Sequence, residues 1–175
     1  MVIPLIRKRF LACFMLIFNF SNSATAQYHY RGEKGLEILW GKSDIGYLFK
    51  GAYSKYFKDN WYYKGGGFYE LGRPFQTDYR NFGIEATACY SFLNFDYEAF
   101  FNIVGGLSAN YEYILNLDLN NKSSINGGAL LGIEGEYFVN ENIAFVGNAT
   151  QYILLNGKFG NRRWDYGIGL KFMIK

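Results

Sequence analysis

The sequence predicts an all-β protein, an eight-stranded antiparallel barrel of the outer-membrane type. Three observations support this fold class. Apolar and polar residues alternate in eight runs of roughly ten residues, short and long connections alternate between the runs, and an export signal precedes them. The composition agrees, because 16 Tyr, 17 Phe and 21 Gly with only 2 Pro favour pleated strands over helices. A chain of 175 residues has room for one such domain.

Residues 1–26 have the features of a secretory signal peptide. Three consecutive basic residues are followed by an apolar core and by an Ala-Thr-Ala cleavage site before Gln27. A retained membrane helix would need about 20 apolar residues, which is longer than the uninterrupted apolar core here. A lipid anchor would use Cys13, but this residue stands before most of the apolar core. We therefore expect residues 1–26 to be removed and residues 27–175 to form a single barrel domain.

Removal of the signal peptide changes the net charge of the protein. The formal net charge of +3 comes from the three basic residues of the signal, so the domain from Gln27 onward has 15 basic and 15 acidic residues. A balanced charge does not favour nucleic-acid binding, and we expect no direct nucleic-acid partner. Cys89 is the only cysteine in this domain, which excludes an intrachain disulfide.

The alternating runs are long enough to cross a bilayer, because tilted strands of ~9–11 residues span it. In chain order they cover residues 35–41, 47–56, 61–71, 81–92, 98–113, 128–139, 143–155 and 164–174. The last run is the clearest, since its even positions are all aliphatic or aromatic and most of its odd positions are glycine or charged. The run at 81–92 repeats this pattern. In the run at 128–139, Leu130 and Phe138 break it.

The connections give independent support for a meander with both ends in the periplasm, because bacterial barrels combine short periplasmic turns with longer outer loops. The short connections are 58–60, 94–96 and 140–142, and the long ones are 72–78, 116–126 and 156–163. The first connection, 42–44, is short for an outer loop. Aromatic rings that anchor at the membrane interface are expected near strand ends, at Trp40, Trp61, Tyr62, Tyr63, Trp164 and Tyr166.

The structural alternative is a soluble eight-stranded barrel or sandwich in the periplasm. Such a fold would bury its apolar face. Here the small and charged face has to line the interior and the aromatic face the exterior, which is stable only if the exterior solvent is lipid. We therefore expect the protein in the outer membrane of a Gram-negative-type cell, with outer-membrane lipid as a partner.

The inward-facing positions of the strands hold the polar residues that could form a site. An eight-stranded barrel is just wide enough to be filled by its own side chains, and buried charges have to pair. We expect an interior ion-pair network without a pore; the alternative is a narrow polar channel or small-ligand site. At the seam, where the last strand should pair with the first, Lys171 and Glu37 are expected on one wall. Direct contact between them is a hypothesis, because the register cannot be read from the sequence. The network consists of Glu37, Lys50, Lys64, Glu70, Glu85, Glu112, Glu134, Glu136, Asp165 and Lys171.

The predicted strands contain no recognisable set of catalytic residues. His29 is the only histidine and precedes the first run, so no Ser-His or Cys-His pair can form on the barrel. His29 and Cys89 do not have the spacing of a metal site. The glycines at 65–67 and 105–106 lie inside strand patterns and lack the Lys-Ser/Thr pair of a phosphate loop. We expect no enzyme activity, no catalytic, cofactor-binding or metal-binding residues, and no cofactor.

Several short motifs are distributed along the domain. They are RGEKGLE at 31–37, GGLSANYE at 105–112, GGA at 127–129, EGEYF at 134–138, and GKF at 157–159 leading into YGIGLKFMI at 166–174. On these motifs the domain resembles, over nearly its whole length, the conjugal transfer protein TraO family of Bacteroides-type conjugative transposons. Members of that family often carry charged residues where this chain has Asn148, Thr150 and Gln151.

The resemblance implies a non-enzymatic outer-membrane component of a conjugative transfer (mating) apparatus, with other conjugation-apparatus proteins as partners. The alternative is a stand-alone small barrel for adhesion or for uptake of an apolar solute. A third hypothesis, a lipid-modifying barrel enzyme, is disfavoured because no histidine lies on a predicted strand.

Overall fold

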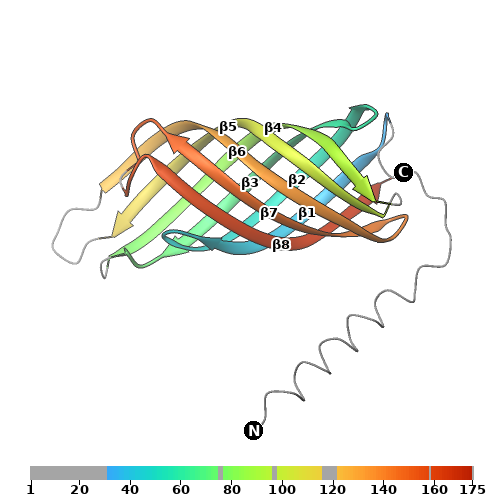
Figure 1. The fold of residues 1–175 in the computed structure, drawn as a ribbon. Helices are drawn as coiled ribbons and strands as arrows, with labels where there is room; N and C mark the ends of the chain where they lie inside the picture. The colour runs from blue at the N-terminus through green and yellow to red at the C-terminus, as the bar shows by residue number, and fades with distance from the viewer. Residues whose placement is uncertain (1–30, 75–76, 96–97, 116–121, 158, 175) are drawn as a thin grey trace, which may run out of the picture.

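The computed structural model describes residues 31–74, 77–95, 98–115, 122–157 and 159–174. These residues form eight antiparallel strands that close into a barrel (Figure 1). The strands are β1 (Lys34–Ser43), β2 (Gly46–Lys58), β3 (Trp61–Gly72), β4 (Asp78–Phe95), β5 (Ala99–Leu115), β6 (Lys122–Asn140), β7 (Ile143–Leu154) and β8 (Arg162–Ile174). The predicted fold class is confirmed. The expected signal peptide and His29 lie outside the described residues.

Each strand pairs with its neighbour in sequence, and β8 pairs with β1 to close the sheet. The end where β1 begins and β8 ends, on the right of Figure 1, is called here the terminal end, and the opposite end the loop end. Turns at the terminal end are short, such as Asp59–Asn60 and Glu141–Asn142, whereas the connections at the loop end include the longer ones. Within the described residues no helix is long and apolar enough to cross a membrane.

The first loop-end connection is as tight as the sequence indicated, and side chains account for it. Ser43 Oγ accepts hydrogen bonds from the backbone N–H groups of Ile45 and Gly46, both at 3.0 Å. A carboxylate oxygen of Asp44 accepts the backbone N–H of Trp164 at 2.8 Å. These bonds replace the ladder partners that the strands lose at the turn, so two residues suffice to join β1 to β2.

The structure corrects the extent of one long connection. Strand β6 begins at Lys122, so the second half of the connection expected at 116–126 continues the sheet. It pairs with the end of β5, where Ile114 lies opposite Lys122. Apart from Ile125, the residues of this part of β6 are polar, and a strand needs apolar side chains only where lipid covers it. Hydrophobic alternation therefore could not reveal it.

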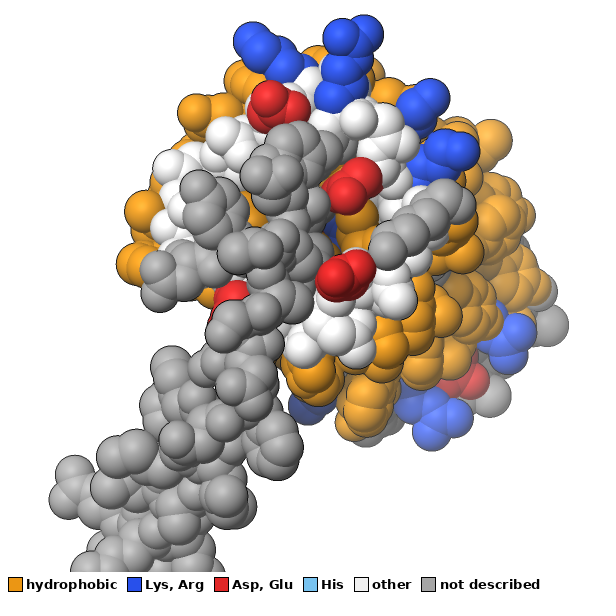
Figure 2. Space-filling view, turned by 90° about the vertical axis from the view of Figure 1, so that its right-hand side faces the viewer, with side chains coloured by type: hydrophobic (Ala, Val, Ile, Leu, Met, Phe, Trp, Pro, Cys, Tyr) orange, Lys and Arg blue, Asp and Glu red, His pale blue; other side chains and the backbone are white. Residues whose placement is uncertain are grey.

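The outer wall is apolar and the polar side chains lie inside or at the ends. Ile168, for example, exposes 72% of its surface. Figure 2, viewed from the terminal end, shows hydrophobic side chains around the wall and charged side chains gathered towards the rim. Of the six aromatic residues expected at the interface, five are exposed on the wall, but Tyr62 is 0% exposed. Alternation between Trp61 and Tyr63 turns Tyr62 inward, where its hydroxyl finds carboxylate partners.

Candidate functional site: the charged barrel interior

All ten residues expected in the interior network face the inside of the barrel. Lys171 and Glu112 are fully buried, and the most exposed of the ten side chains, Glu85, has 16% of its surface accessible. The structure adds Arg163, a buried residue that the sequence analysis assigned to a loop. The described interior thus holds seven carboxyl groups, on Glu37, Glu70, Glu85, Glu112, Glu134, Glu136 and Asp165, and four basic groups, on Lys50, Lys64, Arg163 and Lys171.

The cluster nearest the terminal end is built around Lys171. Its Nζ donates hydrogen bonds to Glu136 Oε1 at 3.0 Å and Oε2 at 3.1 Å, and to the Tyr56 hydroxyl at 3.0 Å. Asn102 Nδ2 donates to Glu136 Oε1 at 2.9 Å. The ammonium group also lies 4.6 Å from the centre of the Tyr62 ring, a cation–π contact. Lys171 is therefore held by carboxylate, phenol and aromatic ring together.

A hydrophobic cluster adjoins this layer. Phe100, Phe138 and Ala144 are buried together, and Met173 packs against them. Phe138 and Leu130, which break the alternating pattern in the sequence, both point inward and are buried. They are inside because their positions are in phase with Glu134 and Glu136.

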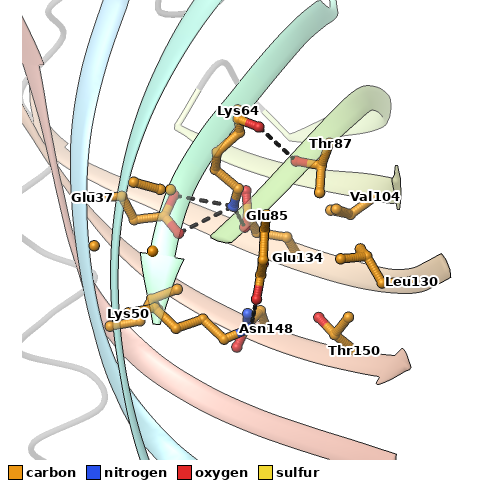
Figure 3. A pocket seen from close by; sticks show the side chains of 15 residues that line it. Glu37, Lys50, Lys64, Glu85, Thr87, Val104, Leu130, Glu134, Asn148 and Thr150 are labelled. Carbon is orange, nitrogen blue, oxygen red and sulfur yellow. Dashed lines mark hydrogen bonds and ion pairs between the residues drawn. The ribbon is translucent and has the colours of Figure 1, made fainter. Parts of the chain in front are cut away.

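The second cluster is centred on Lys64 (Figure 3). Its Nζ lies 3.1 Å from Glu37 Oε1 and 3.3 Å from Glu37 Oε2, and it also forms an ion pair with Glu134. Tyr62 links this cluster to the first, because its hydroxyl lies 2.7 Å from Glu134 Oε1 and 3.1 Å from Glu136 Oε1. One lysine thus serves two carboxylates contributed by strands on different sides of the barrel.

The third cluster is centred on Lys50. Its Nζ is 2.7 Å from Asp165 Oδ2 and 3.1 Å from Glu85 Oε1. It also donates to the Tyr152 hydroxyl at 2.6 Å, and Tyr152 in turn donates to Glu85. Two carboxylates, one lysine and one phenol cross the lumen at this level.

The fourth cluster, towards the loop end, is centred on Arg163. This guanidinium forms an ion pair with Glu112, and its Nη1 donates to the Tyr79 hydroxyl at 2.7 Å. Tyr79 donates to Glu112 Oε1 at 2.9 Å, which closes the triangle. Glu70 lies beside it and accepts hydrogen bonds from Asn81 Nδ2, at 3.0 Å, and from Ser43.

Lys171 and Glu37 lie on one inner wall, as expected, but the hypothesis that they contact each other as an ion pair is wrong. The two residues are directly opposite in the β1–β8 ladder. Their ion-pair partners are nevertheless different: Lys171 reaches Glu136, and Glu37 accepts from Lys64. A long lysine side chain can cross the narrow lumen, so its partner need not be on the adjacent strand.

Little space is left between the four clusters. One cavity of about 20 Å³ lies between Glu37, Lys50, Lys64 and Glu134 (Figure 3), and another of about 30 Å³ lies near Arg163. A single buried water needs a cavity of ~10–15 Å³, so these cavities have room for a few waters at most. The surplus of carboxyl groups makes the lumen unfavourable for anions, and its charges make it unfavourable for apolar solutes.

Two other features bear on chemistry. Across the described ranges, no group of three or more His, Cys, Asp or Glu side chains is arranged to hold a metal ion. Cys89 is a buried free thiol whose Sγ lies 3.7 Å from Thr87 Oγ1.

Sequence reasoning missed Arg163 and the inward phenols of Tyr56, Tyr62, Tyr79 and Tyr152. Arg163 was within reach, because extending the last run by one odd position beyond Asp165 puts it inside. The same reasoning from alternation applies to the tyrosines, since Tyr62 is in phase with Lys64 and Tyr56 with Lys50. Aromatic rings near strand ends were instead expected at the membrane interface.

The fold is that of a known class, the small outer-membrane β-barrels. The N-terminal β-barrel domain of Pseudomonas aeruginosa OprF superposes with a TM-score of 0.70 at 14% identity, covering 82% of this chain and 98% of that one. Neisserial surface protein A gives 0.60 at 16%, with 80% and 95% covered. The Yersinia pestis attachment invasion locus protein Ail gives 0.57 at 9%, with 82% and 99% covered. No family model and no curated protein matches the sequence.

Proposed function

We propose that this protein is a non-enzymatic barrel of the outer membrane that acts as a surface for contact and adhesion rather than as a conduit. The observation that carries the proposal is the filled lumen. Four layers of hydrogen-bonded charges cross it, and the cavities between them hold a few waters at most. Uptake of an apolar solute through such a lumen would require desolvated ion pairs to separate.

The location rests on the distribution of apolar surface. Large side chains such as Ile84, Leu107 and Ile168 are exposed all around the wall, where only lipid can cover them favourably. The export signal expected in the sequence is consistent with that destination. The names of two structural neighbours, a surface protein and an attachment protein, support a role at the cell surface.

A second candidate is a component of a conjugative transfer apparatus, with other proteins of that apparatus as partners. It is supported by the resemblance to the TraO family and by the position of two of its motifs. The motifs at 134–138 and 166–174 supply Glu136 and Lys171, which bind each other inside the barrel. The motifs that carry the resemblance therefore include residues that form the interior ion pairs of the barrel.

The filled lumen can be tested in planar lipid bilayers. We expect the refolded full-length barrel to insert without a lasting ionic conductance, because no continuous aqueous path crosses the charged layers. Insertion is checked separately by the different gel mobility of boiled and unboiled samples. A stable conductance from the inserted barrel would overturn the contact-surface proposal and favour the narrow polar channel.

A second experiment separates adhesion from conjugation. The full chain is expressed in a non-adherent host, and the attachment of its cells to surfaces is compared with that of the empty host. Increased attachment supports the first proposal. Normal attachment, together with reduced transfer of the mobile element from a donor that lacks the gene, supports the second.

A further inference from the structure

The outer wall has a groove that the charged interior does not explain. Two adjoining hollows, with volumes of about 690 and 660 Å³, share Trp40, Phe101, Gly135, Gly147 and Ile168. These five residues define what is called here the wall groove. It runs across β5, β6, β7, β8 and β1 on the outside of the barrel.

The strand register shows how the groove is formed. Phe101 lies opposite Gly135, Gly135 opposite Gly147, Gly147 opposite Ile168, and Ile168 opposite Trp40. Because paired residues point to the same face of a sheet, two positions without a side chain lie next to each other between bulky apolar groups. The gap is the floor of the groove. Phe101 and Ile168 lie at its two sides, and Trp40 lies beyond Ile168.

The barrel does not require glycine at either floor position. A Cβ atom on Gly135 would meet only ring carbons of Phe101, at 3.8 and 4.0 Å, and one on Gly147 would meet only the carbonyl oxygen of Gly167, at 3.9 Å. These are ordinary van der Waals distances. By contrast, a Cβ on the inward-facing Gly41 would lie 1.9 Å from a backbone oxygen. Glycine weakens a strand interior, and the packing of the barrel does not require it at these two positions. Both can therefore be substituted to fill the floor of the groove.

A cation stands at the edge of the groove nearest the loop end. In the next row of the ladder Ala149 lies opposite Tyr166, Tyr166 opposite Lys42, and Lys42 opposite Tyr47. Lys42 is exposed, and its Nζ lies 5.3 Å from the centre of the Tyr47 ring. No salt bridge joins Lys42 to an acidic residue of the described ranges. Its charge is available to a ligand that approaches along the wall.

We propose that the wall groove binds one anionic lipid, with an acyl chain over Gly135 and Gly147 and the phosphate at Lys42. The apolar floor matches the chain, and the ammonium group of Lys42 beside the Tyr47 ring, without an acidic partner, matches an anionic headgroup at the membrane interface. A second copy of the barrel fits less well, because its wall would cover Lys42 without offering it a carboxylate. The inference rests on the proposed membrane location.

Trp40 provides the reporter. The full chain contains three tryptophans, so Trp61→Phe with Trp164→Phe leaves Trp40 as the only one. This barrel is refolded in phosphatidylcholine vesicles that contain a small fraction of lipid with brominated chains, either phosphatidylglycerol or phosphatidylcholine. We expect brominated phosphatidylglycerol to quench Trp40 about fivefold more effectively, the factor that one lysine near a membrane surface typically contributes.

Two substitutions separate the headgroup from the chain. Lys42→Gln should remove the roughly fivefold preference and leave quenching by phosphatidylcholine unchanged. Gly147→Leu should fill the floor and reduce quenching by both lipids. The matched control is Gly65→Leu on β3, another exposed glycine, where a Cβ would meet only a backbone oxygen at 4.0 Å. It should leave Trp40 quenching unchanged. A second control barrel retains only Trp61 and reports insertion, because both lipids should quench this exposed ring.

Each other outcome overturns the proposal. Equal quenching of Trp40 by the two lipids would show that no anionic lipid is selected. A preference that survives Lys42→Gln would show that Lys42 does not bind the phosphate. Crosslinked pairs of barrels that disappear in Gly147→Leu would identify a second copy as the occupant. If the membrane location itself were wrong, neither brominated lipid would quench Trp40 or Trp61, which distinguishes that failure from loss of selectivity.

Discussion

Replacing Lys171 with Met should destabilise the barrel far more than a substitution of similar size on the lipid-facing wall. Lys171 and Glu136 are both 0% exposed at their side chains, and two hydrogen bonds of 3.0 and 3.1 Å join them. Removing the ammonium group leaves Glu136 buried without its cation. Breaking a buried pair from one side costs ~3–5 kcal/mol, and we expect a loss of this size in the free energy of unfolding.

A double-mutant cycle isolates the interaction. Glu136→Gln keeps the shape of the side chain and its contact with Asn102, and the double variant removes both charges at once. The double variant should lose ~1–3 kcal/mol less than the sum of the two single losses, because neither charge is then left unpaired. Glu37 provides the matched comparison, since it is opposite Lys171 in the ladder but has Lys64 as its partner.

The assay is urea unfolding of the barrel refolded in lipid vesicles, followed by tryptophan fluorescence, with gel mobility as the check that each variant folds. The coupling of Lys171 to Glu136 should exceed its coupling to Glu37. Equal couplings in the two cycles would refute the reasoning, because adjacency in the ladder would then matter as much as the observed ion pair. A negligible loss for Lys171→Met would indicate that this lysine is hydrated in an open lumen.

Three further outcomes are expected. Gly41→Ala should destabilise the β1–β8 seam by ~1–3 kcal/mol in urea unfolding, because its Cβ would overlap a backbone oxygen. Gly147→Ala should be neutral or slightly stabilising, and equal losses of stability in the two variants would contradict this. Cys89 should react with a maleimide reagent only after unfolding, and rapid labelling of the folded barrel would contradict its burial. If the conjugation candidate is correct, a donor that lacks the gene should transfer its element less often at unchanged growth; normal transfer would count against that candidate.

The fold could be predicted because the alternation has a physical cause. A strand with lipid on one side and a packed interior on the other must alternate, and residues 164–174 do so without a break in their apolar rank. The same logic placed all ten network residues inside. Extension of β6 to Lys122 could not be predicted, because no lipid constrains residues beyond the membrane.

The partners inside the network could not be predicted either. Alternation gives the face on which a residue lies, but not how far its side chain reaches across the lumen. Lys64 pairs with Glu37 and Glu134, which lie on different strands, and the sequence contains no measure of the distance between them. The environment of Tyr62 was equally hard to predict, because its ring suits a membrane interface and its hydroxyl suits a carboxylate partner.

The long sequence separations of the interior contacts have a consequence for assembly. Tyr62 and Glu134 are 72 residues apart, Lys50 and Tyr152 are 102 apart, and Lys171 and Tyr56 are 115 apart. A single hairpin that entered the membrane would carry its carboxylates and ammonium groups into lipid before their partners arrived, at a cost of several kcal/mol for each. Stepwise insertion of separate hairpins is therefore unfavourable. The strands should cross the bilayer in one concerted event, with the arrival of β8 and its Lys171 completing it.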